Sequence, residues 1–190
     1  MILSSLHGNS NVMWSRGGQS TRIIALILFF MLSFLLIAYY NIEPEPPSPS
    51  YPSDQWEFLW FKYEEDSETT WGKYLNQSYL TEWNFSFNYT TGEVAETGEY
   101  ENVELRASRT LTVPSKTKYR IVLASDDGIR LFIYNPRFEE VSHITTGWTD
   151  RAYTSHSYER VFEAGEYKIL LEWYEHFDNA QITFNMTIIE

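Results

Sequence analysis

Polar and apolar residues alternate over most of the chain after residue 54, in short runs that are typical of β-strands. Two runs near the C-terminus have one apolar face each: Tyr167, Ile169, Leu171 and Trp173 in the first, and Ile182, Phe184, Met186 and Ile188 in the second. A third run places apolar residues at 85, 87 and 89 and polar residues at 84, 86 and 88. No segment after residue 54 has a helical period. The pattern predicts an all-β domain, an antiparallel barrel or sandwich, over residues 55–190.

The segment Ser125-Asp126-Asp127-Gly128 separates two predicted strands, residues 119–124 and 129–134. Both runs are short and rich in β-branched and aromatic residues. The simplest interpretation is a tight turn between the two strands. A second interpretation concerns chemistry. Neighbouring carboxylates aim at one point only if the backbone leaves the strand conformation, and two converging oxygen ligands suit a calcium ion.

An uncharged stretch covers residues 23–40. As an α-helix it would extend about 27 Å, close to the roughly 30 Å hydrocarbon core of a bilayer. Arg16 and Arg22 precede this stretch, and residues 1–40 contain no acidic residue. The positive-inside rule then predicts a single transmembrane helix with a cytoplasmic N-terminal segment, residues 1–22. The C-terminal domain would be extracellular, on a cell or envelope membrane.

Two alternatives to a retained anchor remain open. A secretory signal would be cleaved, although the tyrosines at 39 and 40 make a poor cleavage site. The residues Arg16-Gly17-Gly18-Gln19 resemble the cleavage context of archaeal prepilins, but Pro44 comes early for a pilin helix. Residues 41–54 follow and hold five of the seven prolines, which predicts an extended linker near polyproline II geometry.

Charge and composition exclude several classes of function. Residues 41–190 carry all 26 acidic and 12 of the 14 basic side chains, a net charge of −14 that repels nucleic acid. The absence of cysteine excludes thiol catalysis and thiolate metal sites. His143, His156 and His176 lack metal-ligand spacing and are expected at the surface. No triad or separated carboxylate pair stands out, so we expect no enzyme.

Four pieces of sequence occur in the order and spacing of a known domain. They are the run Tyr119–Tyr134, the loop Gly147–Asp150, the stretch Phe162–Ile169 and the strand end Glu172–Glu175. Together they resemble the protective-antigen-type β-barrel domain, the PA-fourteen family, over roughly residues 55–190. The resemblance implies a β-barrel of a family in which many members bind carbohydrate and are found in adhesins, toxins and glycosidases.

In the family's lectin members, two aspartates joined by a cis peptide bond bind calcium, and the ion binds sugar hydroxyls. By position, Asp126 and Asp127 match this pair, and Glu175 matches a further ligand where adhesins often carry asparagine. Asp178 or Asn179 in the following loop would add an oxygen, and backbone carbonyls and water would complete the coordination. The long sugar-contacting insertions of the adhesins are missing from this chain.

Trp148 has two interpretations. Its indole would stack on the apolar face of a sugar ring, as part of a carbohydrate site with Asp126 and Asp127. Alternatively, it belongs to the barrel core.

Four Asn-x-Ser/Thr acceptors for N-linked glycans occur on the predicted extracellular side: Asn76, Asn84, Asn88 and Asn185. Three of these asparagines fall on the polar face of a predicted strand, where a bulky glycan can be carried. The alternative is that they are only polar strand residues.

Taken together, the sequence predicts a membrane-anchored extracellular binding module that recognises carbohydrate with the help of calcium. Its partner would be a glycan or an envelope glycoprotein. The alternative is a structural envelope, coat or filament subunit, whose β-domain packs against its own copies or another envelope protein.

Overall fold

The structure is a computed structural model that describes residues 24, 26–34, 47–63, 72–89, 93–176 and 180–189. The chain divides into two compact units, Met1–Glu45 and Pro46–Glu190. The second unit begins before the predicted domain boundary at residue 55, so it includes the end of the predicted linker.

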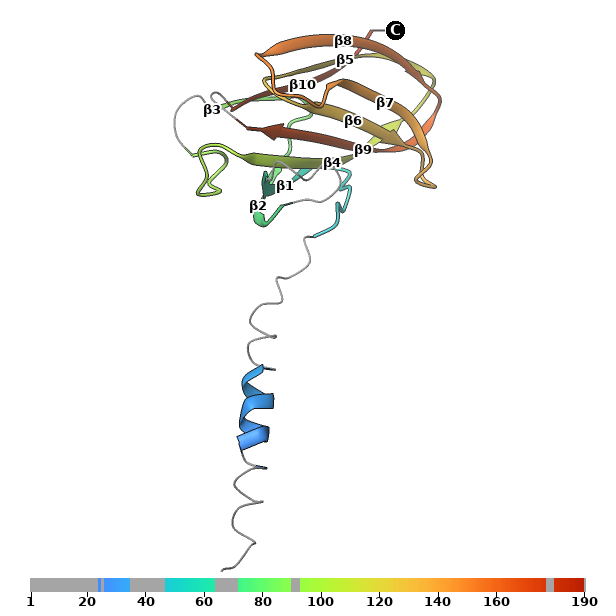
Figure 1. Cartoon of the computed structure of the whole chain (residues 1–190). Helices are drawn as coiled ribbons and strands as arrows, with labels where there is room; N and C mark the ends of the chain where they lie inside the picture. Colours follow the sequence, from blue (N-terminus) through green and yellow to red (C-terminus); the bar gives the residue numbers. More distant parts are fainter. Residues whose placement is uncertain are drawn as a thin grey trace, which may run out of the picture. The chain divides into compact units, whose positions relative to one another are not determined.

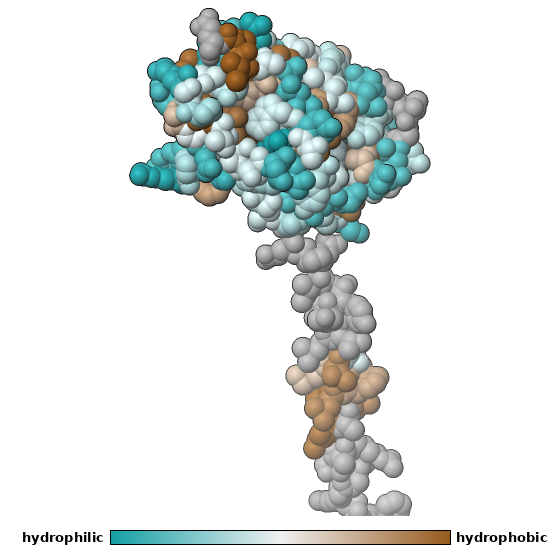
Figure 2. All heavy atoms as spheres, turned by 180° about the vertical axis from the view of Figure 1, so that it is seen from behind, coloured by the Kyte–Doolittle hydropathy of each residue, from teal (hydrophilic) through white to brown (hydrophobic). Residues whose placement is uncertain are grey.

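In the first unit, residues 26–34 are α-helical. The apolar side chains of this helix are 53–71% exposed where they are described, and they form the brown segment of Figure 2. The predicted span 23–40 is longer, but its remaining residues, apart from residue 24, lie outside the described ranges. Within those ranges, no helix is both long enough and apolar enough to cross a bilayer.

The second unit is all-β among its described residues, as predicted. Its strands are β1 (Trp56–Lys62), β2 (Tyr74–Leu80), β3 (Phe85–Tyr89), β4 (Val103–Val113), β5 (Thr117–Ser125), β6 (Ile129–Tyr134), β7 (Glu140–Gly147), β8 (Thr154–Phe162), β9 (Gly165–Glu175) and β10 (Ala180–Ile188). They form a six-stranded sheet in the order β2-β1-β4-β9-β6-β7 and a four-stranded sheet in the order β3-β10-β5-β8. Every pair is antiparallel, and the two sheets make a sandwich (Figure 1).

The core lies between the two sheets and confirms most of the predicted apolar faces. Ile169, Leu171 and Trp173 of β9 are fully buried, and so are Ile182 and Phe184 of β10. The predicted face of β10 ends early, because its last apolar residue, at position 188, is 66% exposed. Aromatic rings of β1, β3 and β10 pack edge-to-face at 5.1–5.6 Å, which accounts for much of the high aromatic content.

Strand β9 is buried on both faces, which its alternating sequence did not predict. Leu170, Glu172 and Tyr174 point away from the sandwich core, yet each is less than 9% exposed. The reason is that β9 is an interior strand of the larger sheet. Neighbouring side chains cover its outer face, including the guanidinium groups of Arg106 and Arg130, which pair with Glu172 at 3.4 and 2.6 Å.

The end of the predicted linker is bound to the larger sheet. The Ser50 amide donates to Glu57 Oε2 at 2.6 Å. Thr110 donates its hydroxyl to the Tyr51 carbonyl at 2.6 Å and its amide to the Pro52 carbonyl at 2.8 Å. Residues 50–52 therefore form part of the folded domain, whereas the sequence predicted a spacer up to residue 54.

Strands β5 and β6 belong to different sheets. The Ser125–Gly128 segment is therefore a short turn that crosses from one sheet to the other. The two predicted strands themselves are confirmed. Because strands in different sheets diverge, this crossing brings the segment against the ends of β9 and β10 and the loop after β7.

The four glycan acceptors lie where a sheet surface is accessible. Asn84 and Asn88 are exposed, and Asn76 and Asn185 are half-buried. Asn84 Oδ1 accepts a hydrogen bond from the Met186 amide at 2.8 Å, which leaves its amide nitrogen outside this contact. Their predicted modification is compatible with these positions.

Candidate functional site

The Ser125–Gly128 crossing places both aspartates in the interior of one end of the sandwich. Asp126 is 7% exposed and Asp127 is 4% exposed. Asp127 adopts a φ of 49°, in the left-handed region that aspartate tolerates better than most residues. The backbone thus leaves the strand conformation, which the calcium interpretation requires. No cis peptide bond occurs among the described residues, so the cis bond implied by the family resemblance is wrong here.

Asp127 ties three segments together. Its Oδ1 accepts a hydrogen bond from the Arg151 amide at 2.9 Å, and its Oδ2 accepts one from the His176 amide at 2.9 Å. The Asp127 amide also donates to the Arg151 carbonyl at 3.0 Å. One carboxylate therefore fixes both the loop after β7 and the end of β9 relative to the crossing.

Asp126 points to a different neighbour. Its Oδ1 accepts a hydrogen bond from the Gln181 amide at 2.7 Å, at the start of β10. Its Oδ2 is fully buried and receives no hydrogen bond from any N–H or O–H of the described residues. The Glu175 carboxyl, itself 1% exposed, lies within hydrogen-bonding range of the Asp126 carboxyl. Two buried acidic groups in contact must share a proton or face a cation.

The predicted calcium ligands are thus brought together in part. Asp126 and Glu175 meet, whereas both oxygens of Asp127 bind backbone amides. Asp178 and Asn179 lie outside the described residues. Within the part of the chain that the structure describes, no group of three or more histidine or acidic side chains is placed to hold a metal ion.

Trp148 is half-buried, and its backbone lies close to Gly128 of the crossing. The Arg130 guanidinium lies over its indole ring, 4.0 Å from the ring centroid, and Glu172 holds that guanidinium at 2.6 Å. The Tyr174 ring meets the indole edge-on at 4.7 Å. Arg130 thus covers part of the indole, and a sugar ring would have to stack on the remaining surface.

A polar cluster beside Trp148 is not evident from the sequence. Asp150 accepts a hydrogen bond from the Tyr174 hydroxyl at 3.0 Å and pairs with His176 Nδ1 at 3.0 Å. The Tyr63 ring stacks on Tyr174 at 4.8 Å. Burial and the negative charge of Asp150 raise the pKa of Tyr174 above its ordinary value. His176 is only 9% exposed, so its expected place at the surface is wrong.

Arg151 fixes the loop that carries Trp148 and was not singled out in the sequence. Its guanidinium donates to the carbonyl and the hydroxyl of Thr146 and to Ser125 Oγ. Arg151 therefore closes the loop on Thr146 and joins it to the crossing through Ser125 and Asp127. Its position directly after the Gly147–Asp150 motif is the one sequence signal that marks this arginine.

The acid at position 126 makes the stability of the domain depend on pH. Burial, assisted by the negative charge of Asp127 and opposed by the Gln181 hydrogen bond, raises the pKa of Asp126 from 3.8 to about 6. Between these two values the folded protein holds a proton that the unfolded chain has lost, so stability increases as the pH falls. Above about pH 6 this contribution disappears.

We therefore expect the urea midpoint of the calcium-free protein to be higher at pH 5 than at pH 7.5. In Asp126→Asn, this rise should be largely absent, because the variant has no proton to bind at this position. Urea unfolding in a chelating buffer at both pH values measures it. An equal rise in the parent and in Asp126→Asn would contradict the assignment.

No protein-family model matches the sequence, and no curated protein matches it significantly. Solved structures do resemble it. An anti-sigma factor domain-containing protein superposes with a TM-score of 0.53 and 19% identity over 70% of this chain. A second such protein, from Clostridium clariflavum, gives 0.52 and 14% over 77% of this chain. This chain spans 42% and 47% of their lengths. The class that these matches define is a shared antiparallel β fold and nothing narrower.

A third neighbour is the Epithelial Adhesin 9 A domain of Candida glabrata, solved in complex with Galb1-3GlcNAc. It superposes with a TM-score of 0.46 and 12% identity, over 77% of this chain and 88% of its own length. A TM-score below 0.5 does not establish a common fold, so the ligand of that adhesin carries no weight for this chain.

Proposed function

We propose that this chain is a membrane-anchored extracellular binding module that recognises carbohydrate at the Ser125–Gly128 crossing, with calcium as a ligand. The observation that carries this proposal is the pair of buried carboxyls at Asp126 and Glu175. An acidic oxygen without a donor, in contact with a second acid, costs stability unless a proton or a cation compensates it. A cation bound between these two carboxyls would compensate their negative charge and so stabilise the fold.

The oxygen ligands at this site are of the kind that calcium prefers, but the described side chains supply fewer than the roughly six to eight that calcium takes. Asp126 and Glu175 supply hard carboxylate oxygens, and each oxygen of Asp127 retains a further lone pair beside its amide contact. Asp178 and Asn179, together with backbone carbonyls and water, are the proposed remaining ligands. When bound, calcium would supply open coordination positions for sugar hydroxyls. Asp127 also has a role that needs no ion, since it holds the flanking segments in place.

The surface next to the carboxyls offers the groups that a sugar needs. The indole of Trp148 provides an apolar face, and the guanidinium of Arg130 and the carboxylate of Asp150 provide a donor and an acceptor. Asp150 has 49% of its side chain exposed, so it is accessible from solvent. Aromatic rings beside hydrogen-bonding groups are the usual composition of carbohydrate sites.

The membrane location is a proposal based on the N-terminal segment. Residues 23–40 are uncharged, and the helical part at residues 26–34 exposes apolar side chains that a bilayer would cover. Arg16 and Arg22 then place the N-terminus in the cytoplasm and the β-domain outside. The extracellular side is also where the four glycan acceptors would be modified.

Calcium binding is tested by thermal unfolding of the full chain in detergent, with calcium or with chelator. At a calcium concentration of 100 times Kd, binding would stabilise the fold by about 2.7 kcal/mol and raise Tm measurably. Asp126→Asn and Glu175→Gln should abolish the shift. Asp150→Asn, which changes a carboxylate outside the buried pair, should keep it. Superimposed unfolding curves for the parent protein would refute the calcium part of the proposal.

Carbohydrate recognition is tested by a glycan array probed with the full chain, with and without chelator. We expect binding that calcium supports and that Trp148→Ala weakens by about twofold to tenfold, the size of an aromatic stacking contact. An array without any bound glycan, for a protein with normal thermal stability, would favour the alternative of a coat or filament subunit.

A further inference from the structure

The two lateral sides of the sandwich differ in how their edge strands are protected. On one side lie β7 and β8, and side chains join them across the sheets: the Tyr158 hydroxyl donates to the Thr145 carbonyl at 3.1 Å. This pair of edges carries the charged residues Glu140, Glu159 and Arg160. Charged side chains on edge strands hinder pairing with another chain.

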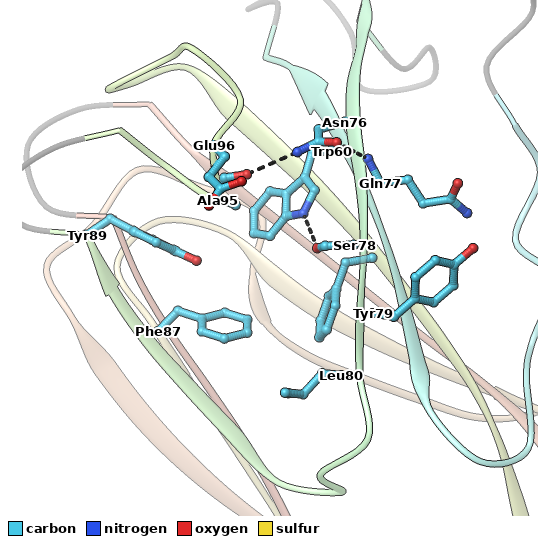
Figure 3. Close-up of a pocket in the computed structure, with 11 residues that line it drawn as sticks. Trp60, Asn76, Gln77, Ser78, Tyr79, Leu80, Phe87, Tyr89, Ala95 and Glu96 are labelled. Atoms are coloured by element: carbon cyan, nitrogen blue, oxygen red, sulfur yellow. Dashed lines mark hydrogen bonds between the residues drawn. The ribbon is translucent and has the colours of Figure 1, made fainter.

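On the opposite side lie the edge strands β2 and β3, which contain no charged residue at all. This is unexpected in a domain, residues 55–190, that holds 23 acidic and 12 basic side chains and so has a net charge of −11. A cavity of about 400 Å³ opens between the two strands, and Ser78 and Leu80 of β2 face Phe87 and Tyr89 of β3 across it (Figure 3). In the strand order of the two sheets, β2 is the terminal strand beyond β1 and β3 is the terminal strand beyond β10.

Uncharged edge strands can pair with a strand of another molecule. A second copy of this chain is the partner that fits best. Two acidic domains repel one another over most of their surface, and the β2/β3 side is where copies meet without like charges on the pairing strands. Two copies would therefore associate through the β2/β3 side unless another group covered it.

Glycan acceptors occur on these two strands and not on β7 or β8. Asn76 is at the centre of β2 and lines the cavity, and its amide nitrogen donates to the Ala95 carbonyl at 3.3 Å. An N-glycosylated asparagine retains one N–H, so this bond is compatible with modification. Asn88 is on β3 and exposed. Glycans attached to Asn76 and Asn88 would cover the uncharged edge strands β2 and β3.

We propose that N-linked glycans on Asn76 and Asn88 cover the β2 and β3 edges, and that without them a second copy of this chain binds there. The proposal rests on the extracellular location given under Proposed function, because acceptors are modified only in the secretory pathway. It does not depend on calcium or on carbohydrate binding.

The test uses the full chain, produced in a eukaryotic secretory host and solubilised in detergent. Glycopeptide mass spectrometry measures occupancy at each acceptor, and light scattering after size exclusion measures the protein mass in the micelle. We expect occupied Asn76 and Asn88 and a monomer. Asn76→Gln/Asn88→Gln should shift the mass to a dimer or larger, whereas the matched control Asn185→Gln, on the interior strand β10, should remain a monomer.

A rescue variant separates edge pairing from general loss of solubility. Asn76→Gln/Asn88→Lys/Tyr79→Lys carries no glycan on these strands and replaces it with charge on both edges, so it should return to a monomer. Unoccupied acceptors would overturn the proposal, as would a monomeric double variant or a lysine variant that still associates. If none of the four acceptors is occupied and an accessibility assay places the domain in the cytoplasm, the extracellular location has failed as well.

Discussion

Gly128→Ala is expected to lower the free energy of unfolding by about 3 kcal/mol, since overpacking of a buried site costs 1–3 kcal/mol or more. A Cβ at this position would overlap Cε1 of Tyr174 and lie 2.8 Å from its Cδ1 and 3.1 Å from the Cα of Trp148. Tyr174 has little room to move, because it is 2% exposed, stacked on Tyr63 and bonded to Asp150.

The size of this effect is measurable by thermal unfolding. For a domain of about 150 residues, 3 kcal/mol corresponds to a fall in Tm of roughly 6–12 °C. The backbone of Gly128 is outside the left-handed region, so alanine is penalised by contact alone. Gly128→Ala in a Tyr174→Leu background should therefore cost much less than in the parent protein. A double-mutant cycle showing equal losses in both backgrounds would contradict this explanation.

Asp127→Ala is expected to destabilise the domain by about 3–5 kcal/mol, because it leaves two amides without their charged acceptor at 1–3 kcal/mol each. Alanine also tolerates the left-handed backbone of this position less well, at a cost of roughly 1–2 kcal/mol. Asp127→Asn should lose about half as much. Asparagine accepts the left-handed conformation, and its one carbonyl oxygen can keep one of the two amide bonds.

Hydrogen exchange identifies the cause of this loss. In the parent protein, the amides of Arg151 and His176 should exchange slowly, and Asp127→Ala should accelerate both. Asp150→Ala is the control: it removes side-chain bonds to Tyr174 and His176 but should leave the Arg151 amide protected. Unchanged protection in Asp127→Ala, with a loss of less than 1 kcal/mol, would show that the carboxylate does not hold these segments.

Both predictions concern contacts between segments that are distant in sequence, and such contacts mark the limit of what the sequence predicts. The period of two in β9 and β10 identified their inward faces, because side-chain direction in a strand follows from local geometry. The same period did not predict that the outer face of β9 is buried as well, since that burial depends on which strands and side chains lie beside it.

In the Asp-Asp-Gly segment, too, local features were evident from the sequence and the contacts with distant segments were not. Its two acids, its glycine and the flanking strands were evident from the sequence, and so was the need for a backbone turn. Strands β5 and β6 belong to different sheets, however, and nothing local distinguishes a hairpin from a crossing. The polar cluster around Asp150 was missed for a related reason: its members lie in segments whose proximity depends on the sheet order.

The sequence by itself determined the all-β class, the main apolar faces, the uncharged N-terminal stretch and the acidic, cysteine-free composition, because these follow from residue type and spacing. Only the tertiary structure decided which carboxyls meet, which one binds backbone amides, where the linker ends and which edge strands lie side by side. Those outcomes depend on how two sheets pack and which segments their strand order brings together, and residues far apart in the chain determine them jointly.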